Sequence, residues 1–316
     1  MSRCRRDGGP LPAGLLISSG DPLTDKPKIS LTDFSLIIAT VIWGSDYPFA
    51  KMAMREISPL SFSAARTMLA TAALFPFFLR QEESWSVSRR DFLYLGILAG
   101  LGTFLNRICW SVGLNLTTAS NAALLMSTSP IFVLIPSAFL LRSTVTLRAT
   151  LGILISFLGV FLVIKGDWQG WTFSGEGLQG DLIILGAAIS WALFTILAKF
   201  LLKDHSSLKV TAYVMAVGSI LFIPFLPNEK PGGWAEVSPF AWFCIIYVAL
   251  SGNCLAYFLW MKGIQNIGPL RTILYSYIIP ITAMTFSIPL LGETVTAMQM
   301  AGALIVFTGI FLARSG

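Results

Sequence analysis

The chain has 316 residues, of which 55% are hydrophobic and only 12% are charged, with a mean hydropathy of +0.74 and a formal net charge of +6. Soluble domains carry roughly a quarter charged residues, so this composition excludes an ordinary soluble enzyme and indicates an all-α integral membrane protein. In that setting the excess of basic residues is expected in cytoplasmic loops, and no nucleic-acid partner is predicted.

The residue types that build metal and cofactor sites are scarce. The four cysteines have no CxxC spacing, and the single histidine, His205, lies in a predicted polar turn. Neither a metal site nor a disulfide framework follows, and no cofactor is predicted. A GxxxxGK[ST] phosphate-binding loop is absent, so a gradient must supply the energy for any movement of a solute.

Residues 1–32 are rich in Gly, Pro, Ser and Arg, and their longest apolar run, at residues 14–17, is too short for the core of a signal peptide. We therefore expect a disordered cytoplasmic tail. Ten apolar stretches follow, each on the order of the 20 residues that a membrane-spanning helix needs. They occupy approximately residues 33–55, 60–80, 91–115, 118–141, 146–165, 180–202, 207–226, 239–265, 267–291 and 295–313. A polar linker at 166–179 separates the first five from the last five.

The two groups of five are copies of one another. With an offset of 148 residues, Trp43 pairs with Trp191, Lys51 with Lys199, and Pro76 with Pro224. With an offset of 150, Trp110 pairs with Trp260, Gly113 with Gly263, Pro130 with Pro280, and residues 144–146 with 294–296. Duplicated helix bundles are typical of secondary transporters. The sequence thus predicts one repeat at 33–165 and a second at 180–313.

Because five is odd, the second repeat must enter the membrane from the side opposite to the first, so the repeats are predicted to be inverted. With residues 1–32 inside, the predicted cytoplasmic segments hold fifteen basic residues, whereas the outer loops hold three, Arg55, Lys165 and Lys230. This bias places both termini in the cytoplasm and the 166–179 linker outside. We expect a multi-pass protein of the cell membrane, either inner or plasma.

Three charged residues lie well inside predicted spans. Asp46 is near the middle of its span and is the only acid predicted in a span interior, while Arg66 and Arg107 lie in the next two spans. Their repeat counterparts are, in the same order, Phe194, Val214 and Tyr257. Charges needed only to hold a repeat together should recur in its copy, so these three indicate a task performed once per molecule, such as binding a substrate. The alternative is a buried ion pair between Asp46 and one of the arginines.

Polar and aromatic residues near these charges predict a binding cavity. On the third span Thr103, Arg107 and Trp110 share one helix face, and their counterparts Asn253, Tyr257 and Trp260 do so on the eighth. The predicted cavity further includes Trp43, Asp46, Tyr47, Arg66, Asn121, Tyr275 and Tyr277. For Trp110, Trp260 and Tyr277 a place in the interfacial aromatic belt is an equal alternative.

Several motifs resemble one known family. Residues 42–51, 57–60 and 64–66 are similar to the opening of an EamA-type repeat of the drug/metabolite transporter superfamily, and residues 279–280 and 290–296 resemble its closing signature. Two positions depart from the pattern: Asp46 stands where Asn is common, and Ser143 stands where the second repeat has Glu293. The resemblance implies a ten-helix secondary transporter of small organic solutes, often an exporter of amino acids or related metabolites.

These features predict a transporter that works by alternating access on a small organic solute. The arginines favour a carboxylate-bearing solute, because a guanidinium group binds carboxylates bidentately. Asp46 could couple proton movement to solute movement if its protonation changes between conformations. A passive channel or a membrane sensor is the alternative reading. An enzyme is less favoured, since the predicted interior offers one acid and no histidine.

Overall fold

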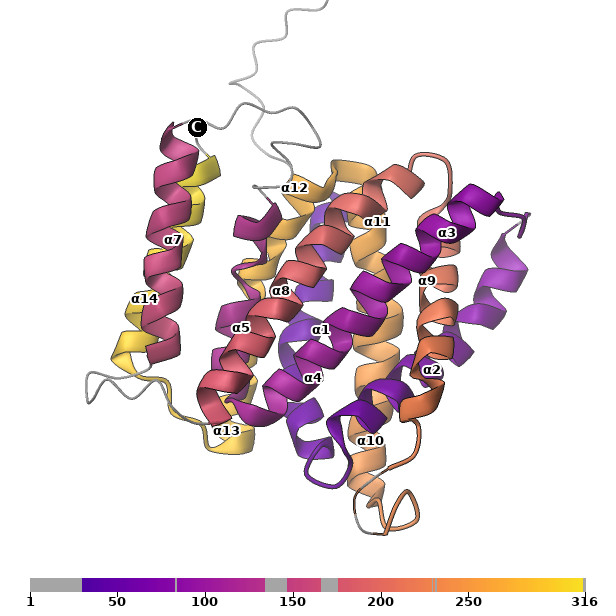
Figure 1. Ribbon diagram of the computed structural model, residues 1–316, viewed down its shortest axis with the longest axis horizontal. Coiled ribbons are helices and arrows are strands. Elements are labelled where there is room, and N and C mark those ends of the chain that lie inside the picture. The colour runs from indigo at the N-terminus through magenta and orange to yellow at the C-terminus, as the bar shows by residue number, and fades with distance from the viewer. Residues whose placement is uncertain are drawn as a thin grey trace, which may run out of the picture. The chain divides into compact units, whose positions relative to one another are not determined.

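The computed structural model describes residues 30–82, 84–133, 147–165, 176–228, 230 and 232–314. Residues 1–29 of the predicted tail, 166–175 of the predicted linker, the end of the span predicted at 118–141, and Ser143 lie outside this part. The described residues are helical and contain no β-strand (Figure 1). Within them, six helices are long and apolar enough to cross a membrane, at 59–81, 89–116, 177–201, 207–225, 239–267 and 269–291.

The first half of the chain forms helices close to the predicted spans. Its elements are α1 (Leu31–Ala53), α2 (Pro59–Gln81), α3 (Arg89–Leu98), the π-helix η1 (Ala99–Leu105), α4 (Asn106–Leu116), α5 (Ala119–Met126) and α7 (Leu147–Lys165). Helices α2, α3 and α5 begin after Ser58, Ser88 and Thr118, whose side-chain oxygens accept a hydrogen bond from the backbone N–H three residues on. Such N-caps satisfy donors that the first helical turn leaves free.

The second half repeats this pattern. Its elements are α8 (Glu176–Leu201), α9 (Ser207–Phe222), the 3-10 helix η2 (Ile223–Phe225), α10 (Pro239–Tyr247), the π-helix η3 (Val248–Ala256), α11 (Tyr257–Ile267), α12 (Pro269–Thr272), the 3-10 helix η4 (Ile273–Tyr277), α13 (Ile278–Leu291) and α14 (Ala297–Arg314). The N-caps Ser206 and Ser238 are the counterparts of Ser58 and Ser88, and η3 lies where the offset of 150 places η1. Helix α8 begins at Glu176, so residues 176–179 are helical and not linker.

Contacts between loops define two ends of the helical region. At one, the Asp33 end, Tyr275 donates to Asp33, Ser206 donates to Glu82, and Asn266 lies 3.1 Å from Thr32. At the other, the Glu56 end, Glu56 accepts from Ser238 N at 2.7 Å, the Lys230 ammonium donates to the Met54 carbonyl oxygen at 2.6 Å, and Glu293 accepts from Ala119 N at 2.6 Å.

Helices α1 and α8, the first of each half, run in opposite directions. Helix α1 starts at the Asp33 end and finishes with Lys51, which donates to the carbonyl oxygen of Thr117. Thr117 in turn donates to Asp181, in the second turn of α8, at 2.7 Å. Helix α8 therefore starts where α1 finishes. It ends at Leu201, and the carbonyl oxygen of the next residue, Leu202, accepts from Gln265 beside the Asp33 end.

The helices of the two halves pack against each other through small residues. A Cβ at Gly113 in α4 would lie 2.8 Å from Ile184 in α8. The same contact exists between the repeat counterparts of these two residues, because a Cβ at Gly263 in α11 would lie 2.6 Å from Leu36 in α1. Helices α7 and α14 contact along Gly159 and Gly302 (Figure 1). Such close approach maximises van der Waals contact where lipid supplies no hydrophobic driving force between helices.

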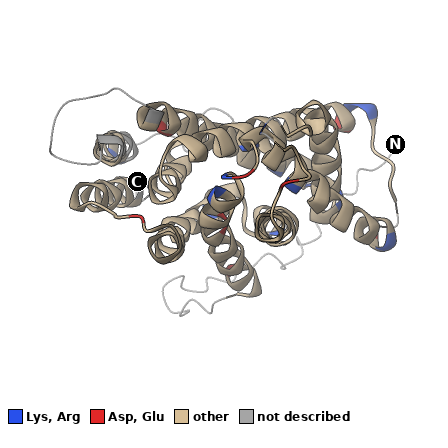
Figure 2. Ribbon diagram, turned by 90° about the horizontal axis from the view of Figure 1, so that it is seen from below, with Lys and Arg blue, Asp and Glu red and all other residues tan. Residues whose placement is uncertain are grey.

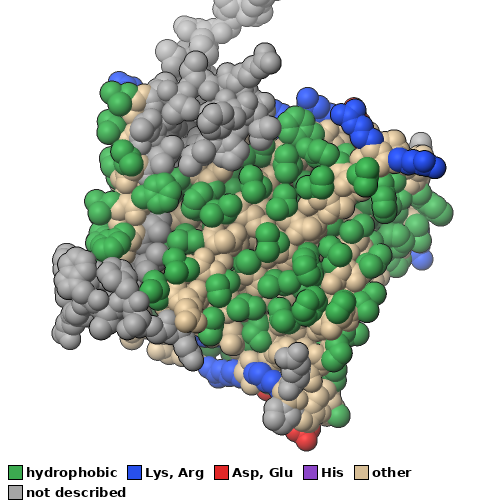
Figure 3. Space-filling model, viewed as in Figure 1, with side chains coloured by type: hydrophobic (Ala, Val, Ile, Leu, Met, Phe, Trp, Pro, Cys, Tyr) green, Lys and Arg blue, Asp and Glu red, His purple; other side chains and the backbone are tan. Residues whose placement is uncertain are grey.

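The outer face of these helices is apolar. Many large hydrophobic side chains are exposed, and Figure 3 shows them covering most of the described surface in view, with Lys and Arg gathered near its edges. Figure 2 shows that most of the helical ribbon carries no charged residue. A soluble monomer rarely exposes so extensive an apolar surface, so lipid is the fitting solvent for this face. Three of the charged residues inside the helices, Asp46, Arg66 and Arg107, line one cavity.

Candidate functional site

A cavity of about 610 Å³, its open mouth included, lies between helices of the two halves. Eight of the thirteen residues predicted from the sequence line it: Trp43, Asp46, Tyr47, Arg66, Arg107, Trp110, Asn253 and Tyr257. They come from α1, α2, α4, η3 and α11, which are separated by up to about 200 residues of sequence. The fold thus brings the three interior charges predicted from sequence into one space.

Arg66 in α2 is buried, and in the described part of the chain its Nε has no hydrogen-bond acceptor. It is 3% exposed, and the carbon of its guanidinium group lies 4.4 Å from the centre of the Trp110 ring and 5.1 Å from that of Phe62. These distances are typical of cation–π contacts. Among the described residues, Nε has no partner. The N–H edge of the group is therefore available to a ligand.

Arg107 in α4 joins the two halves of the chain. One terminal nitrogen donates to Oδ1 of Asn253 in η3, and the guanidinium carbon lies 5.5 Å from the centre of the Tyr257 ring. Its Nε, like Nδ2 of Asn253, has no partner among the described residues. Arg107 is 6% exposed. A second cation thus faces the cavity with unused hydrogen-bond donors.

Among the described residues, Asp46 in α1 is the only acid that lines the cavity. It is 4% exposed, and its Oδ1 has no hydrogen-bond partner in the described part of the chain. Neither arginine lies within ion-pairing distance of it there, so the buried ion pair considered above is not formed in this structure. If all three groups are ionised, the cavity carries an excess of one positive charge. Ionised groups buried this far from water are costly unless something pairs with them.

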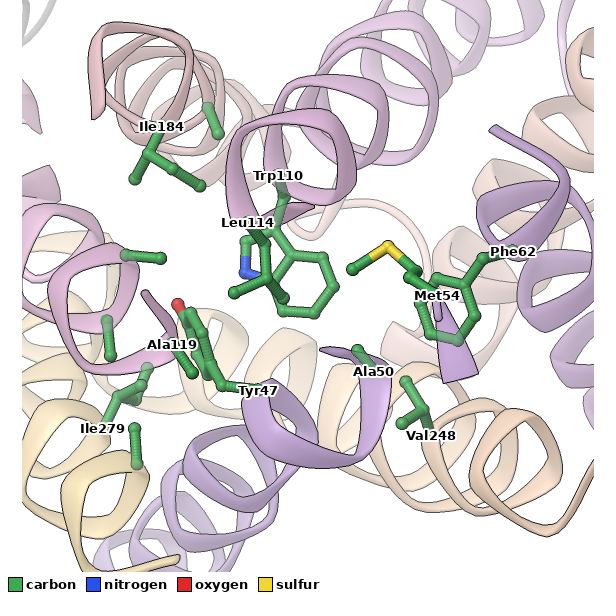
Figure 4. Packing of buried hydrophobic residues seen from close by; sticks show 14 of the residues in the cluster. Tyr47, Ala50, Met54, Phe62, Trp110, Leu114, Ala119, Ile184, Val248 and Ile279 are labelled. Carbon is green, nitrogen blue, oxygen red and sulfur yellow. The ribbon is translucent and has the colours of Figure 1, made fainter. Parts of the chain in front are cut away.

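Aromatic rings form much of the remaining wall. The Trp43 indole donates to the carbonyl oxygen of Gly252 at 3.0 Å, and its ring meets that of Trp191, its repeat counterpart, edge to face at 5.3 Å. Tyr47 and Trp110 meet at 5.1 Å, and Figure 4 shows them next to each other in the packed interior. Packing of this kind holds the rings in place around the cavity.

Thr103 and Trp260 were predicted on the cavity face but do not line it. Thr103 points at α9, where a Cβ on Gly218 would overlap its side chain. Thr103 lies in the π-helix η1, and its side chain is taken up by this packing against α9 instead of lining the cavity. Trp260 is fully buried behind Trp43, with ring centres 5.0 Å apart.

The other three predicted residues also lie outside the lining. Asn121 donates to Asp181 at 2.6 Å near the Glu56 end. Tyr275 donates to Asp33 at the opposite end, and the Tyr277 ring packs on Phe307 of α14 at 5.1 Å. Residue type and span position could not distinguish these packing roles from a place in the cavity.

Six lining residues were missed by sequence reasoning: Asn106, Met126, Ser129, Trp191, Ser276 and Ile279. Trp191 could have been found, since it is the repeat counterpart of Trp43. The others carry no charge and no distinctive spacing. Sequence reasoning also did not single out Asp181, which is buried near the start of α8, where it accepts from Thr117 and Asn121.

Outside the spans, Glu56 has a pKa held below its ordinary value by two hydrogen bonds from Ser238, one from the backbone N–H and one from the hydroxyl at 2.8 Å. Within the described residues, no three Asp, Glu, His or Cys side chains lie close enough to hold a metal ion. The chemistry of the cavity is therefore that of two cations, one carboxylate and several aromatic rings.

Comparison with known proteins agrees with this architecture. The model of the EamA-like transporter family matches twice, at residues 30–165 and 178–315. An uncharacterized transporter of Archaeoglobus fulgidus is 28% identical over 90% of this chain and 97% of its own length. The uncharacterized transporter YyaM of Bacillus subtilis is 30% identical over 87% of this chain and 90% of its own length.

A more distant relative has a more informative name. A protein of Salmonella typhimurium called "Probable amino-acid metabolite efflux pump" is 22% identical over 88% of this chain and 93% of its own length. A solved crystal structure of a protein at 17% identity superposes with a TM-score of 0.66, covering 90% of this chain and 96% of its own. At that identity the structural likeness shows the fold alone.

Proposed function

As a member of the EamA-like transporter family, this chain is a multi-pass membrane transporter of small solutes, and we propose that it exports carboxylate-bearing organic metabolites by alternating access. The observation that carries the proposal is the pair of buried arginines, Arg66 and Arg107, facing one carboxylate in a cavity between the two halves. The family relationship also argues against an enzymatic role.

The carboxylate of a solute would match the hydrogen-bond donors of the two arginines better than the surrounding protein atoms do. A guanidinium group presents N–H donors in a planar fork that matches two carboxylate oxygens, and it stays charged at any accessible pH. The Nε atoms of both arginines lack an acceptor within the described residues. A carboxylate entering the cavity would supply these missing acceptors and offset the excess positive charge. Trp43, Tyr47, Trp110 and Tyr257 would then contact the rest of the solute, with Asn253 holding Arg107.

The architecture we infer has ten transmembrane helices in two inverted repeats, at 33–165 and 180–313. The opposite directions of α1 and α8 support the inversion, and the matched N-caps and π-helices support the duplication. The Asp33 end would face the cytoplasm, because Arg80, Arg89 and Lys203 lie near it. Both termini and the tail that precedes α1 would then be cytoplasmic and the 166–175 linker outside, in an inner or plasma membrane.

Alternating access requires contacts at each end that can break in turn. At the Glu56 end, Glu293 caps α5 through the N–H groups of Ala119 and Ser120, and lies 3.9 Å from Lys51. At the Asp33 end, Ser206 donates to Glu82 and Tyr275 donates to Asp33. These polar contacts are reversible in a way that apolar core packing is not. Opening one set while the other stays closed would expose the cavity to one side at a time.

The direction of transport and the coupling complete the proposal. The name of the Salmonella typhimurium relative supports export of a metabolite related to amino acids. Asp46 is the acid in the cavity through which proton movement could be coupled to that of the solute, since the two arginines keep their charge.

Counterflow in proteoliposomes tests the proposal. Vesicles holding the purified full-length protein are loaded with an unlabelled metabolite, and uptake of the labelled form is followed for a panel of carboxylates, with and without a pH gradient. Alternating access predicts that internal solute accelerates uptake of label, because the loaded carrier returns to the outside. Uptake that is independent of internal solute would indicate a passive channel, and a panel with no counterflow at all would contradict the proposal.

A further inference from the structure

We propose that the solute is a small monoanion with a flat aromatic body and no ammonium group, that is, an aromatic monocarboxylate. This inference rests on the proposed function, because it assigns the chemical class that the transport cavity holds. It follows from three properties of the cavity: its charge, its unused hydrogen-bond donors and its aromatic wall.

The first property is the balance of charge. Arg66 and Arg107 contribute two positive charges to the lining and Asp46 contributes one negative charge. A monoanion brings the sum to zero, whereas a zwitterion leaves an excess of one positive charge and a dicarboxylate leaves one negative charge. An uncompensated charge is costly in a site this deeply buried. A net charge of −1 is therefore the best match for the cavity.

An ammonium group on the solute would make this balance worse. Its natural partner would be Asp46, the only carboxylate in the lining. That pairing would take up the one negative charge that the protein offers to its two guanidinium groups. Arg66 and Arg107 would then share a single solute carboxylate with no other anion nearby. The same solute skeleton without its amino group avoids this competition.

The second property is the set of unused donors. The guanidinium carbon of Arg66 lies within cation–π distance of the Trp110 and Phe62 rings, and its Nε has no hydrogen-bond partner within the described residues. Arg107 already gives one terminal nitrogen to Asn253 and keeps Nε free within the described residues. A carboxylate has two oxygens and about four acceptor sites, enough for both arginines at once. One carboxylate is thus sufficient.

The third property is the aromatic wall. Five rings line the cavity, from Trp43, Tyr47, Trp110, Trp191 and Tyr257. An aromatic solute gains stacked or edge-to-face contacts with such rings beyond the area it buries. A polyhydroxylated body, such as that of a sugar acid, would lose hydration without finding matching partners on these rings. The wall therefore favours a planar apolar body.

A series of three probes with one phenylethyl skeleton tests the charge. They are 3-phenylpropanoate, phenylalanine and 2-phenylethylamine, which carry net charges of −1, 0 and +1. Binding to the full-length protein in detergent is measured by isothermal titration calorimetry. We expect phenylalanine to bind about tenfold more weakly than 3-phenylpropanoate, or weaker still, and the amine not to bind. Equal or tighter binding of phenylalanine, or no saturable binding of 3-phenylpropanoate at millimolar concentration, would overturn the proposal.

The aromatic requirement and the site need their own controls. Butanoate carries the same charge without a ring, and binding as tight as that of 3-phenylpropanoate would overturn the aromatic assignment. Arg66→Ala should lose at least about tenfold in affinity for 3-phenylpropanoate. Arg80→Ala, an exposed arginine on the same helix, should not. Arg66→Lys keeps the charge, so a folded Arg66→Lys variant with partial affinity distinguishes lost binding from misfolding. Unchanged affinity in folded Arg66→Ala would place the ligand elsewhere.

The binding measurement also separates this inference from the transport proposal. If 3-phenylpropanoate binds as expected but shows no counterflow in proteoliposomes, alternating access fails and the ligand assignment stands. If counterflow occurs with phenylalanine and not with 3-phenylpropanoate, transport stands and the ligand assignment fails.

Discussion

The carboxylate of Asp46 in α1 lies so close to Gly252 in η3 that a Cβ atom at position 252 would lie 2.7 Å from Asp46 Cγ and overlap Oδ2. The same contact exists between the repeat counterparts. A Cβ at Gly102 in η1 would lie 2.8 Å from Cε2 of the Phe194 ring in α8, and closer still to other ring atoms. One contact between helices has thus been kept in both halves, with a carboxylate in one and an aromatic ring in the other.

This relationship predicts that Gly252→Ala destabilises the protein by about 1–3 kcal/mol, the usual cost of overpacking a filled core. Thermal unfolding of the purified protein, followed by size-exclusion chromatography with fluorescence detection, measures the effect. Asp46→Ala in the same chain should recover part of the loss, because it removes the overlapping atoms. Gly96→Ala is the matched control, since a Cβ at Gly96 meets nothing within 4 Å. A Gly252→Ala variant as stable as Gly96→Ala would contradict the contact.

Arg107→Ala should abolish counterflow while folded protein remains in the membrane. Truncating one partner of a buried, hydrogen-bonded charge pair costs about 2–5 kcal/mol, which corresponds to a loss of affinity on the order of 100-fold. Initial rates of counterflow over a range of solute concentrations provide the measurement. Arg80→Ala, also on a cavity-forming helix but exposed, should transport like the wild type. Normal transport by Arg107→Ala would remove this residue from the binding site.

Asp46→Asn should leave solute exchange intact but make it insensitive to a pH gradient. The amide has nearly the shape of the carboxylate and cannot change its charge, so coupling through this position is lost while the cavity remains. Counterflow and pH-driven accumulation are compared in the same vesicles. Asp204→Asn, an exposed acid in the turn after α8, is the control. Full pH-driven accumulation in Asp46→Asn would exclude this residue from coupling, and loss of folded protein would favour a structural role.

The lowered pKa of Glu56 predicts that the folded protein loses stability in acid. Because its pKa in the folded protein is lowered by the hydrogen bonds from Ser238, its contribution is present above the ordinary glutamate pKa of about 4.3 and is lost as the pH falls through the folded value. The Tm of the wild type should therefore fall more between about pH 6 and about pH 3.5 than the Tm of Glu56→Gln. Glu236→Gln, an exposed glutamate nearby, should behave like the wild type. Parallel curves for Glu56→Gln and wild type would refute this linkage.

Cysteine labelling tests the orientation. In a variant without the native cysteines, Ala235→Cys at the Glu56 end should react with a membrane-impermeant maleimide added to intact cells. Lys203→Cys at the Asp33 end should react only after the membrane is opened. Both positions are exposed, so accessibility within the fold does not distinguish them. The reverse pattern would mean that the Glu56 end faces the cytoplasm and the Asp33 end faces outward. Labelling of both positions from outside would contradict the proposed topology.

The sequence predicted the helical class because apolar stretches of spanning length and few charges leave little alternative in lipid. It also predicted the duplication, since Trp43 and Trp191 keep their spacing. It identified Asp46, Arg66 and Arg107, because charges inside apolar spans are rare enough to stand out one by one. Approximate helix boundaries followed from the lengths of the apolar stretches, which are a local property of the sequence.

The tertiary structure decided which polar residues share a space. Thr103 and Arg107 are four residues apart, yet Arg107 lines the cavity whereas Thr103 packs against Gly218 in α9. The absence of an ion pair between Asp46 and the arginines, among the described residues, depends on distances between α1, α2 and α4 that no spacing encodes. A pattern along one helix is set by local geometry and can be read from sequence. The distance between two helices is set by the summed packing of every side chain between them, and only the folded protein fixes it.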